Sequence, residues 1–172
     1  MRKVAVIASA SGSGKTTVGR ALAAELGVPF VELDALVHGQ NWVETPDDEL
    51  RDLLVPVLAG GGWVIDGGYW GKIGDLVLSR ADVVVWIDLP IHVWLPRLIR
   101  RTVRRLRGHE EIWNGNRETV LGAVWGRGAL FPYALRTHFS RRRAYPARLM
   151  PYSVVRLRSQ SAVDAFLSGV AP

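Results

Sequence analysis

The chain has 172 residues, enough to bury the core of one domain without help from disulfides or structural metals. It contains no cysteine, which excludes disulfide frameworks, thiolate zinc sites and catalytic thiols and fits a reducing cytoplasm. Residues 1–90 carry 7 Lys and Arg against 12 Asp and Glu, whereas residues 91–172 carry 15 against 4. Such a basic second half suits nucleotide phosphates, nucleic acid or an anionic membrane, and charge alone does not choose among them.

The first residues resemble a signal peptide only superficially. An apolar run, residues 4–10, follows two basic residues, but it is short and continues into a glycine-rich loop that a cleaved segment has no reason to carry. No apolar run approaches the roughly 20 residues that a membrane-spanning helix needs. We therefore expect a soluble cytoplasmic protein, as a monomer or a homodimer.

Strand-like and helix-like segments alternate along the chain. Short apolar runs bounded by glycine or proline predict strands at residues 4–7, 29–34, 63–66, 83–88 and 153–157. Apolar residues at helical spacing predict helices at residues 15–26, 45–58, 73–78, 91–107, 118–124, 134–143 and 162–167. This alternation predicts an α/β fold with a parallel sheet.

The segment between the first predicted strand and the first helix gives the strongest chemical signal. It reads Ser11, Gly12, Ser13, Gly14, Lys15, Thr16 and Thr17. In such a loop, backbone N–H groups and a helix N-terminus bind phosphate, the lysine reaches the terminal phosphates and the next hydroxyl binds Mg²⁺. We therefore predict that residues 11–17 bind the phosphates of ATP or GTP, with ATP preferred, that Lys15 is also catalytic, and that Thr16 is a metal ligand. Ser9 departs from the full pattern, which has a glycine at that position.

Two carboxylates end predicted strands near this loop. Asp66 precedes two glycines and can orient Mg²⁺ through water. Asp34 ends the neighbouring strand and can accept or position the proton of an acceptor hydroxyl in a phosphoryl transfer. Turn capping without a catalytic role is the alternative for both. His38 indicates little by itself, because a lone histidine is more often structural.

Arginines form a row along the predicted helix 91–107. Arg97 and Arg101 are four residues apart and share one face, which Arg105 continues. This face would place positive charge where a transferring phosphoryl group needs it. A solvated basic face that binds nothing is the alternative.

Beyond these motifs, the chain resembles the adenylate kinase-like and shikimate kinase-like group of small P-loop kinases over nearly its whole length. The resemblance is greatest to the topology modulation proteins. It rests on residues 32–34 (Glu-Leu-Asp), 63–67 (Trp-Val-Ile-Asp-Gly), 88–90 (Asp-Leu-Pro) and 111–118 (Glu-Ile-Trp-Asn-Gly-Asn-Arg-Glu).

This resemblance implies a P-loop NTPase three-layer sandwich, with a five-stranded parallel sheet in the order 2-3-1-4-5 and helices on both faces. Residues 1–172 would form a single domain, with a small helical lid at residues 108–150. The resemblance also supports the metal role of Asp66 and the acceptor role of Asp34, and it places Arg97 and Arg101 beside the nucleotide. A lid arginine would close over ATP and exclude water; the candidates are Arg136, Arg141 and Arg142, with Arg141 preferred.

Aromatic residues are expected on both sides of the site. One of Trp42, Tyr69 and Trp70 is a candidate for stacking on a substrate. The aromatic residues of the lid segment are expected to form its small core: Trp113, Trp125, Phe131, Tyr133 and Phe139.

Together these patterns predict an enzyme, an ATP-dependent kinase that uses Mg²⁺ and phosphorylates a small acceptor, either a nucleotide or a hydroxylated metabolite. No recognisable pattern for binding a nucleoside monophosphate supports the nucleotide acceptor. The alternative is a nucleotide-dependent regulatory ATPase that binds nucleic acid through its basic half, although no helix-turn-helix, zinc or RNA-binding signature accompanies the charge. A peripheral membrane role lacks a clear amphipathic anchor.

Overall fold

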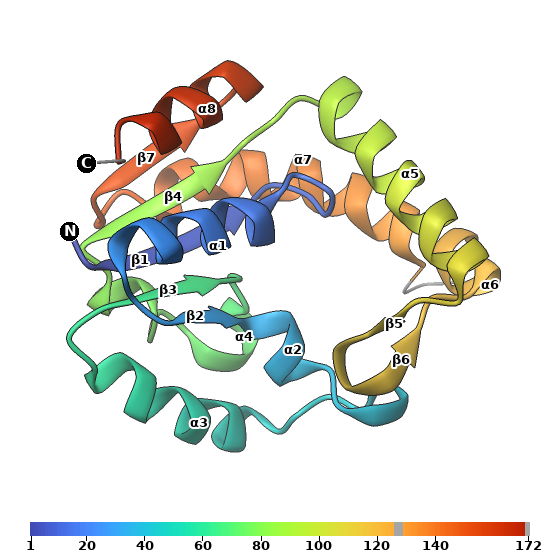
Figure 1. Cartoon of the computed structure of the whole chain (residues 1–172), viewed down its shortest axis with the longest axis horizontal. Helices are drawn as coiled ribbons and strands as arrows, with labels where there is room; N and C mark the ends of the chain where they lie inside the picture. The colour runs from blue at the N-terminus through green and yellow to red at the C-terminus, as the bar shows by residue number, and fades with distance from the viewer. Residues whose placement is uncertain (126–128, 171–172) are drawn as a thin grey trace.

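The computed structural model describes residues 1–125 and 129–170, and its centre is a parallel sheet (Figure 1). The strands of this sheet are β1 (Lys3–Ala8), β2 (Phe30–Glu32), β3 (Trp63–Asp66), β4 (Val83–Ile87) and β7 (Val154–Leu157). They lie in the order β2-β3-β1-β4-β7, which is the predicted order with β7 as the fifth strand. The fold is therefore the predicted α/β P-loop fold.

Helices cover both faces of the sheet. Their bounds are α1 (Lys15–Leu26), α2 (Leu33–Val37), α3 (Asp47–Ala59), α4 (Trp70–Ile73), α5 (Ile91–Gly108), α6 (Val120–Val124), α7 (Leu130–Arg148) and α8 (Gln160–Ser168), with short 3-10 turns η1 (Gln40–Trp42), η2 (Leu78–Arg80) and η3 (Trp113–Gly115). No helix within the described ranges is long and apolar enough to cross a membrane.

Alternate residues of β1 enter two different cores. Val4 and Val6 pack with apolar residues of α1 and α8, whereas Ala5 and Ile7 pack with residues of α3 and α7. Both faces of the strand are thus covered, which is why its sequence is a continuous apolar run rather than an alternating one.

A third apolar cluster fixes α5 and α7 beside the loop between β1 and α1. Ala10 of this loop packs with Trp94 and Leu98 of α5 and with Ala134 of α7. Figure 1 shows α5 beyond the end of the sheet where this loop lies, and α7 running behind the sheet toward the same end. The arginine-bearing helices are therefore anchored next to the glycine-rich loop.

The structure differs from the predicted elements in four places. The helix predicted at residues 73–78 is absent, because α4 ends at Ile73, residues 74–77 form a turn and η2 begins at Leu78. The strand predicted at 29–34 ends at Glu32, and Leu33 and Asp34 begin α2 because the side chain of Leu33 is buried in the core below the helix. The helix predicted at 134–143 is part of the longer α7. Residues 111–117 form an unpredicted antiparallel hairpin of β5 (Glu111–Ile112), η3 and β6 (Asn116–Arg117).

Candidate active site

The loop between β1 and α1 has a backbone that suits phosphate binding. Gly12 and Gly14 have left-handed φ angles of 80° and 88°, and Gly14 caps α1. A Cβ on Gly12 would lie 2.9 Å from the Cβ of Leu98, so close packing on α5 also requires glycine there. The hydroxyl of Ser13 is buried and has no hydrogen-bond partner in the described part of the chain. Residues 11–17 thus lead into a helix N-terminus, where anions bind readily.

Lys15 lies between two carboxylates. Its ammonium group forms an ion pair with Oδ1 of Asp66 and lies 3.7 Å from Oδ2 of Asp34. Burial acts to lower the pKa of Lys15, but the two carboxylates outweigh it, and the pKa is raised. Burial raises the pKa of Asp66, and Lys15 and Thr16 act against this shift. Lys15 is therefore held in its charged form at the edge of the sheet.

Thr16 contacts a third carboxylate that the sequence analysis did not assign to the site. Its Oγ1 donates to Asp66 at 2.7 Å and lies 3.3 Å from Oε1 of Glu32. Glu32 ends β2 directly opposite Asp66 on β3. The strand-end argument that indicated Asp66 missed Glu32 because the predicted strand ended at Asp34, two residues beyond the observed end of β2.

The donor atoms at this point fit Mg²⁺. Thr16, Asp66 and Glu32 supply hydroxyl and carboxylate oxygens, the ligand type that Mg²⁺ prefers, and this ion usually completes its octahedron with water and phosphate oxygens. Among residues 1–125 and 129–170, no group of three or more His, Cys, Asp or Glu residues is arranged to hold a metal by itself. A metal here would therefore depend on the nucleotide for part of its coordination.

Asp34 lies in the first turn of α2 and not at a strand end as predicted. The hydroxyl of Tyr69 donates to its Oδ1 at 2.5 Å and lies 3.3 Å from Nε2 of His38. Burial, together with Asp34, raises the pKa of Tyr69, which keeps this hydroxyl a donor. Tyr69 was considered for stacking, whereas the structure uses its hydroxyl to orient Asp34.

The arginines of the row on α5 differ in whether they have a partner among the described residues. Arg105 forms an ion pair with Glu118 at 2.7 Å. The Nε of Arg101 is buried without a hydrogen-bond partner in the described residues. Burial, followed by the charge of the neighbouring Arg105, lowers the pKa of Arg101, and the charges of Glu118 and Asp34 act against this shift. Arg97, one turn earlier, is half-buried.

The departure at Ser9 has a structural reason. Ser9 does not have a positive φ, so its backbone does not require glycine. Its buried hydroxyl donates to Asp88 at 2.7 Å and accepts from the indole nitrogen of Trp86 at 2.9 Å. Asp88 also binds Arg142 at 3.0 Å and Arg156 at 2.6 Å. The serine therefore belongs to a buried network that joins the loop to α7 and β7.

The three lid-arginine candidates have different surroundings. Arg142 is bound to Asp88, and Arg136 is exposed on α7. Arg141 reaches the carbonyl oxygen of Ala8 at 3.4 Å and the hydroxyl of Tyr133 at 3.3 Å. It also lines a hollow of about 230 Å³ with Trp70, Ser140, Ala144, Tyr145 and Arg148. Of the three, Arg141 alone reaches the start of the phosphate loop within the described residues.

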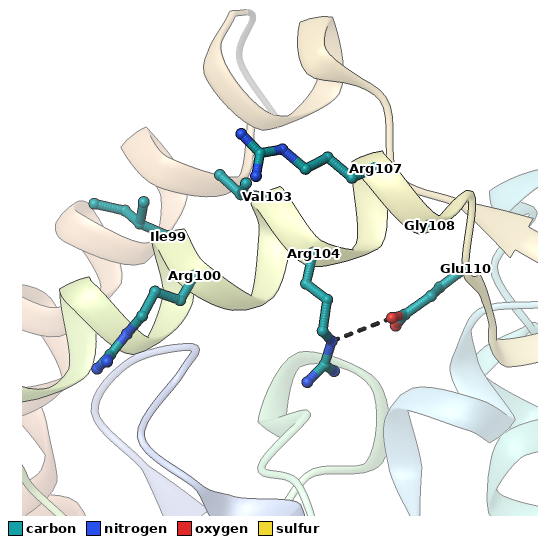
Figure 2. Close-up of a pocket in the computed structure, with 7 residues that line it drawn as sticks. All are labelled: Ile99, Arg100, Val103, Arg104, Arg107, Gly108 and Glu110. Carbon is teal, nitrogen blue, oxygen red and sulfur yellow. Dashed lines mark hydrogen bonds and ion pairs between the residues drawn. The ribbon is translucent and has the colours of Figure 1, made fainter.

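A larger hollow of about 600 Å³ follows the exposed side of α5. Figure 2 shows the apolar side chains of Ile99 and Val103 on this helix, with Arg100 extending to the opposite side and Arg104 reaching toward Glu110. Arg104 is bound to Glu110 at 3.1 Å. Ile99, which lines the hollow, directly follows Leu98 in the sequence of α5, and Leu98 packs against Gly12 of the phosphate loop.

Aromatic side chains cover the acceptor side. Trp113 of the hairpin stacks on His38 with ring centroids 5.5 Å apart, and Trp42 meets the same histidine edge-on at 5.6 Å. Trp125 and Phe139 are 78% and 62% exposed, so the prediction that they form a lid core is wrong. Trp113 was included in that predicted core, whereas it contacts the site itself.

Comparison with known proteins agrees with this geometry. The sequence model of the shikimate kinase family (SKI) matches residues 11–47. Shikimate kinase of Gloeobacter violaceus is 37% identical over 106 residues, which are 51% of this chain and 56% of that protein. The alignment thus spans only about half the length of this relative.

Two solved structures share the fold. Shikimate kinase from Bacteroides thetaiotaomicron has a TM-score of 0.58 at 16% identity and covers 99% of this chain and 96% of its own. A gluconokinase from Sinorhizobium meliloti has a TM-score of 0.53 at 22% identity, with 98% and 91% covered. This chain is therefore similar in sequence to shikimate kinases, at 37% identity over about half its length and, for the shikimate kinase of Brucella canis, at 26% identity over 95% of it. It has the fold of the small P-loop kinases along nearly all of its length.

Proposed function

We propose that this protein is a kinase that transfers the γ-phosphate of ATP, bound with Mg²⁺, to a hydroxyl group of a small acceptor. One observation carries the proposal: Lys15 of the phosphate loop lies between Asp66 on the metal side and Asp34 on the acceptor side. The three parts that phosphoryl transfer needs, a phosphate cation, a metal carboxylate and an acceptor carboxylate, meet at this lysine.

Each residue then has a defined task. The loop amides and Lys15 bind the phosphates, and Thr16, Asp66 and Glu32 would hold Mg²⁺, which neutralises phosphate charge when bound. Asp34, oriented by Tyr69, positions the acceptor hydroxyl and accepts its proton as the new O–P bond forms and the bond to the leaving ADP oxygen breaks.

Two arginines of α5 complete the proposed site. Arg97 and Arg101 would stabilise the negative charge on the transferring phosphoryl group. The apolar side chains and guanidinium groups of the 600 Å³ hollow would receive the nucleotide base.

We further propose that the acceptor is a hydroxylated carboxylic acid. Arg141 and Arg148 line the smaller hollow beside Trp70, which follows Tyr69 in the chain, and both can bind a carboxylate. Lys72, also on this side, is already paired with Glu44 and Asp47. The shikimate kinase and the gluconokinase described above are each named after a hydroxylated carboxylic acid. The resemblance of residues 32–34, 63–67, 88–90 and 111–118 to the topology modulation proteins does not change this proposed acceptor class.

The nucleic-acid alternative is less well supported. Part of the basic charge in the second half is engaged internally, as in the pairs of Arg105 with Glu118 and of Arg142 and Arg156 with Asp88. Paired arginines contribute less to a surface that must neutralise several phosphates.

A coupled ADP-release screen tests the proposal with hydroxylated carboxylic acids, sugars and nucleotides as acceptors. Lys15→Ala is expected to lower turnover by about 10²–10³-fold. Asp34→Asn is expected to lower acceptor-stimulated transfer by about 10²–10⁴-fold while leaving Mg²⁺·ATP binding intact. Circular dichroism checks that both variants fold. The proposal fails if no acceptor raises turnover above basal hydrolysis while nucleotide-dependent DNA binding appears and falls steeply with salt.

A further inference from the structure

The hairpin of residues 111–117 is fastened to the acceptor side of the site. Nδ2 of Asn114 donates to the carbonyl oxygens of Ala35 at 3.0 Å and His38 at 2.7 Å. Nδ2 of Asn116 donates to the carbonyl oxygen of Gly39 at 2.8 Å, and its Oδ1 accepts from the backbone N–H of Trp42 at 2.9 Å. Two amide side chains thus bind four backbone groups of a segment 74 or more residues away.

The hairpin and the segment that it contacts both have backbone conformations suited to this contact. Asn114 has a φ of 59° and Gly115 one of 80°, so the hairpin turns through left-handed residues. In the facing segment, Asn41 and Trp42 have φ angles of 56° and 60°. Asparagine and glycine adopt this region most readily, which explains the Asn-Gly pair at the hairpin tip.

The fastened hairpin places Trp113 between two parts of the site. Its Nε1–H donates to Oε1 of Glu32 at 3.0 Å, the carboxylate atom that lies 3.3 Å from Thr16. Its ring stacks on His38, which leads through Tyr69 to Asp34. Trp113 is the residue through which the hairpin contacts both the metal side and the acceptor side.

We propose that the hairpin is a latch, in which Asn114 and Asn116 hold Trp113 as a positioning residue for Glu32 and for the His38–Tyr69–Asp34 chain. This inference rests on the proposed function, because it takes Glu32 and Asp34 as parts of a kinase site. A hairpin that only added stability would have no effect on the metal side.

The test uses Mg²⁺ and ADP as probes, so that it needs no acceptor. The Mg²⁺ concentration that half-saturates ADP binding is measured by calorimetry. Trp113→Phe keeps a ring that stacks on His38 but removes the donor to Glu32, and we expect the Mg²⁺ midpoint to rise about tenfold, as for other groups that orient a metal ligand. Asn116→Asp removes the donor to Gly39 and should give a similar rise.

Three further measurements separate a latch from a general loss of stability. The double variant should show no more than the larger single shift, because both changes release the same contact. Hydrogen exchange of residues 111–117 should rise in Asn116→Asp. Asn114→Asp provides the same test at an exposed position if Asn116→Asp, which is buried, does not fold.

A matched control is available in the chain. Trp125→Phe makes the same change at an exposed tryptophan and should not move the midpoint. Midpoints that stay at the wild-type value in Trp113→Phe and Asn116→Asp, or shifts that multiply in the double variant, would overturn the latch alone. A wild-type protein that binds no ADP with Mg²⁺ would overturn the kinase proposal as well.

Discussion

The two carboxylates on the metal side of the site are placed by strands, whereas its arginines are placed by helices. Glu32 and Asp66 end β2 and β3 and face each other in the pairing register of the sheet, so backbone hydrogen bonds fix their separation. Arg101 and Arg141 extend from α5 and α7 on long side chains whose direction depends on what surrounds them. The acidic side is therefore set by topology, and the basic side by packing.

This difference changes how the charge of the second half is understood. Asp88 holds Arg142 and Arg156 with its two oxygens, and Glu118 holds Arg105. These arginines support the structure, whereas Arg101 and Arg141 have no carboxylate partner within 4.0 Å in the described residues. An excess of positive charge thus combines structural and candidate functional arginines, which only their partners distinguish.

Adjacent residues of α7 provide the sharpest test of that division. Arg141→Gln should lower acceptor-stimulated turnover by about 10²-fold, as loss of one charged donor does, and leave stability nearly unchanged. Arg142→Gln should instead lower the free energy of unfolding by about 1–2 kcal/mol, because Asp88 loses one buried partner while the arginine itself is 34% exposed. Urea unfolding and the ADP-release assay measure both variants. Equal effects of the two substitutions on both assays would contradict the division.

The fold was predictable because its elements carry local signals. Continuous apolar runs predicted β1, β3 and β4 nearly at their observed bounds, and α1 ends at Leu26 as predicted, with Gly27 capping it in a left-handed conformation. The errors occur at residues whose local conformation depends on tertiary contacts. Leu33 reads as a strand residue but is buried under α2, and the hairpin at 111–117 depends on hydrogen bonds to residues 35–42.

The site was predictable only in part for the same reason. Strand ends and the loop pattern indicated Asp66, Lys15 and Thr16, and the structure brings these together. No local sequence signal distinguishes the roles of Arg141 and Arg142, because the difference between them depends on the position of Asp88 in the folded chain. The hydroxyl of Tyr69 and the indole N–H of Trp113 were likewise assigned to stacking and packing, because their polar partners lie far away in the sequence.

Ser9 connects the phosphate loop to α7 and β7 through Asp88, and its replacement tests this network. Ser9→Gly introduces the residue that the loop pattern contains, yet it should lower the free energy of unfolding by about 1–3 kcal/mol, because Asp88 loses a buried donor and Trp86 an acceptor. Ser9→Ala is the control, since it removes the same hydroxyl without adding backbone freedom, and should cost slightly less. Urea unfolding measures both. A Ser9→Gly variant as stable as the wild type would show that the network is dispensable.

The pH dependence of stability tests the surroundings of His138 on the basic side, and here we expect the smallest effect. Its side chain is fully buried beside Trp94 and Phe139, and burial followed by the charge of Arg142 lowers its pKa below 6.5, with Asp88 acting in the opposite direction. Below pH 6.5 the unfolded chain therefore binds a proton that the folded chain does not, so stability falls as the pH drops through this range, by at most about 1.4 kcal/mol per pH unit for one proton. Urea unfolding at about pH 7.5 and about pH 5.5 measures the loss. His138→Leu should reduce it, whereas an equal loss in this variant would assign the acid sensitivity to the carboxylates of the other side.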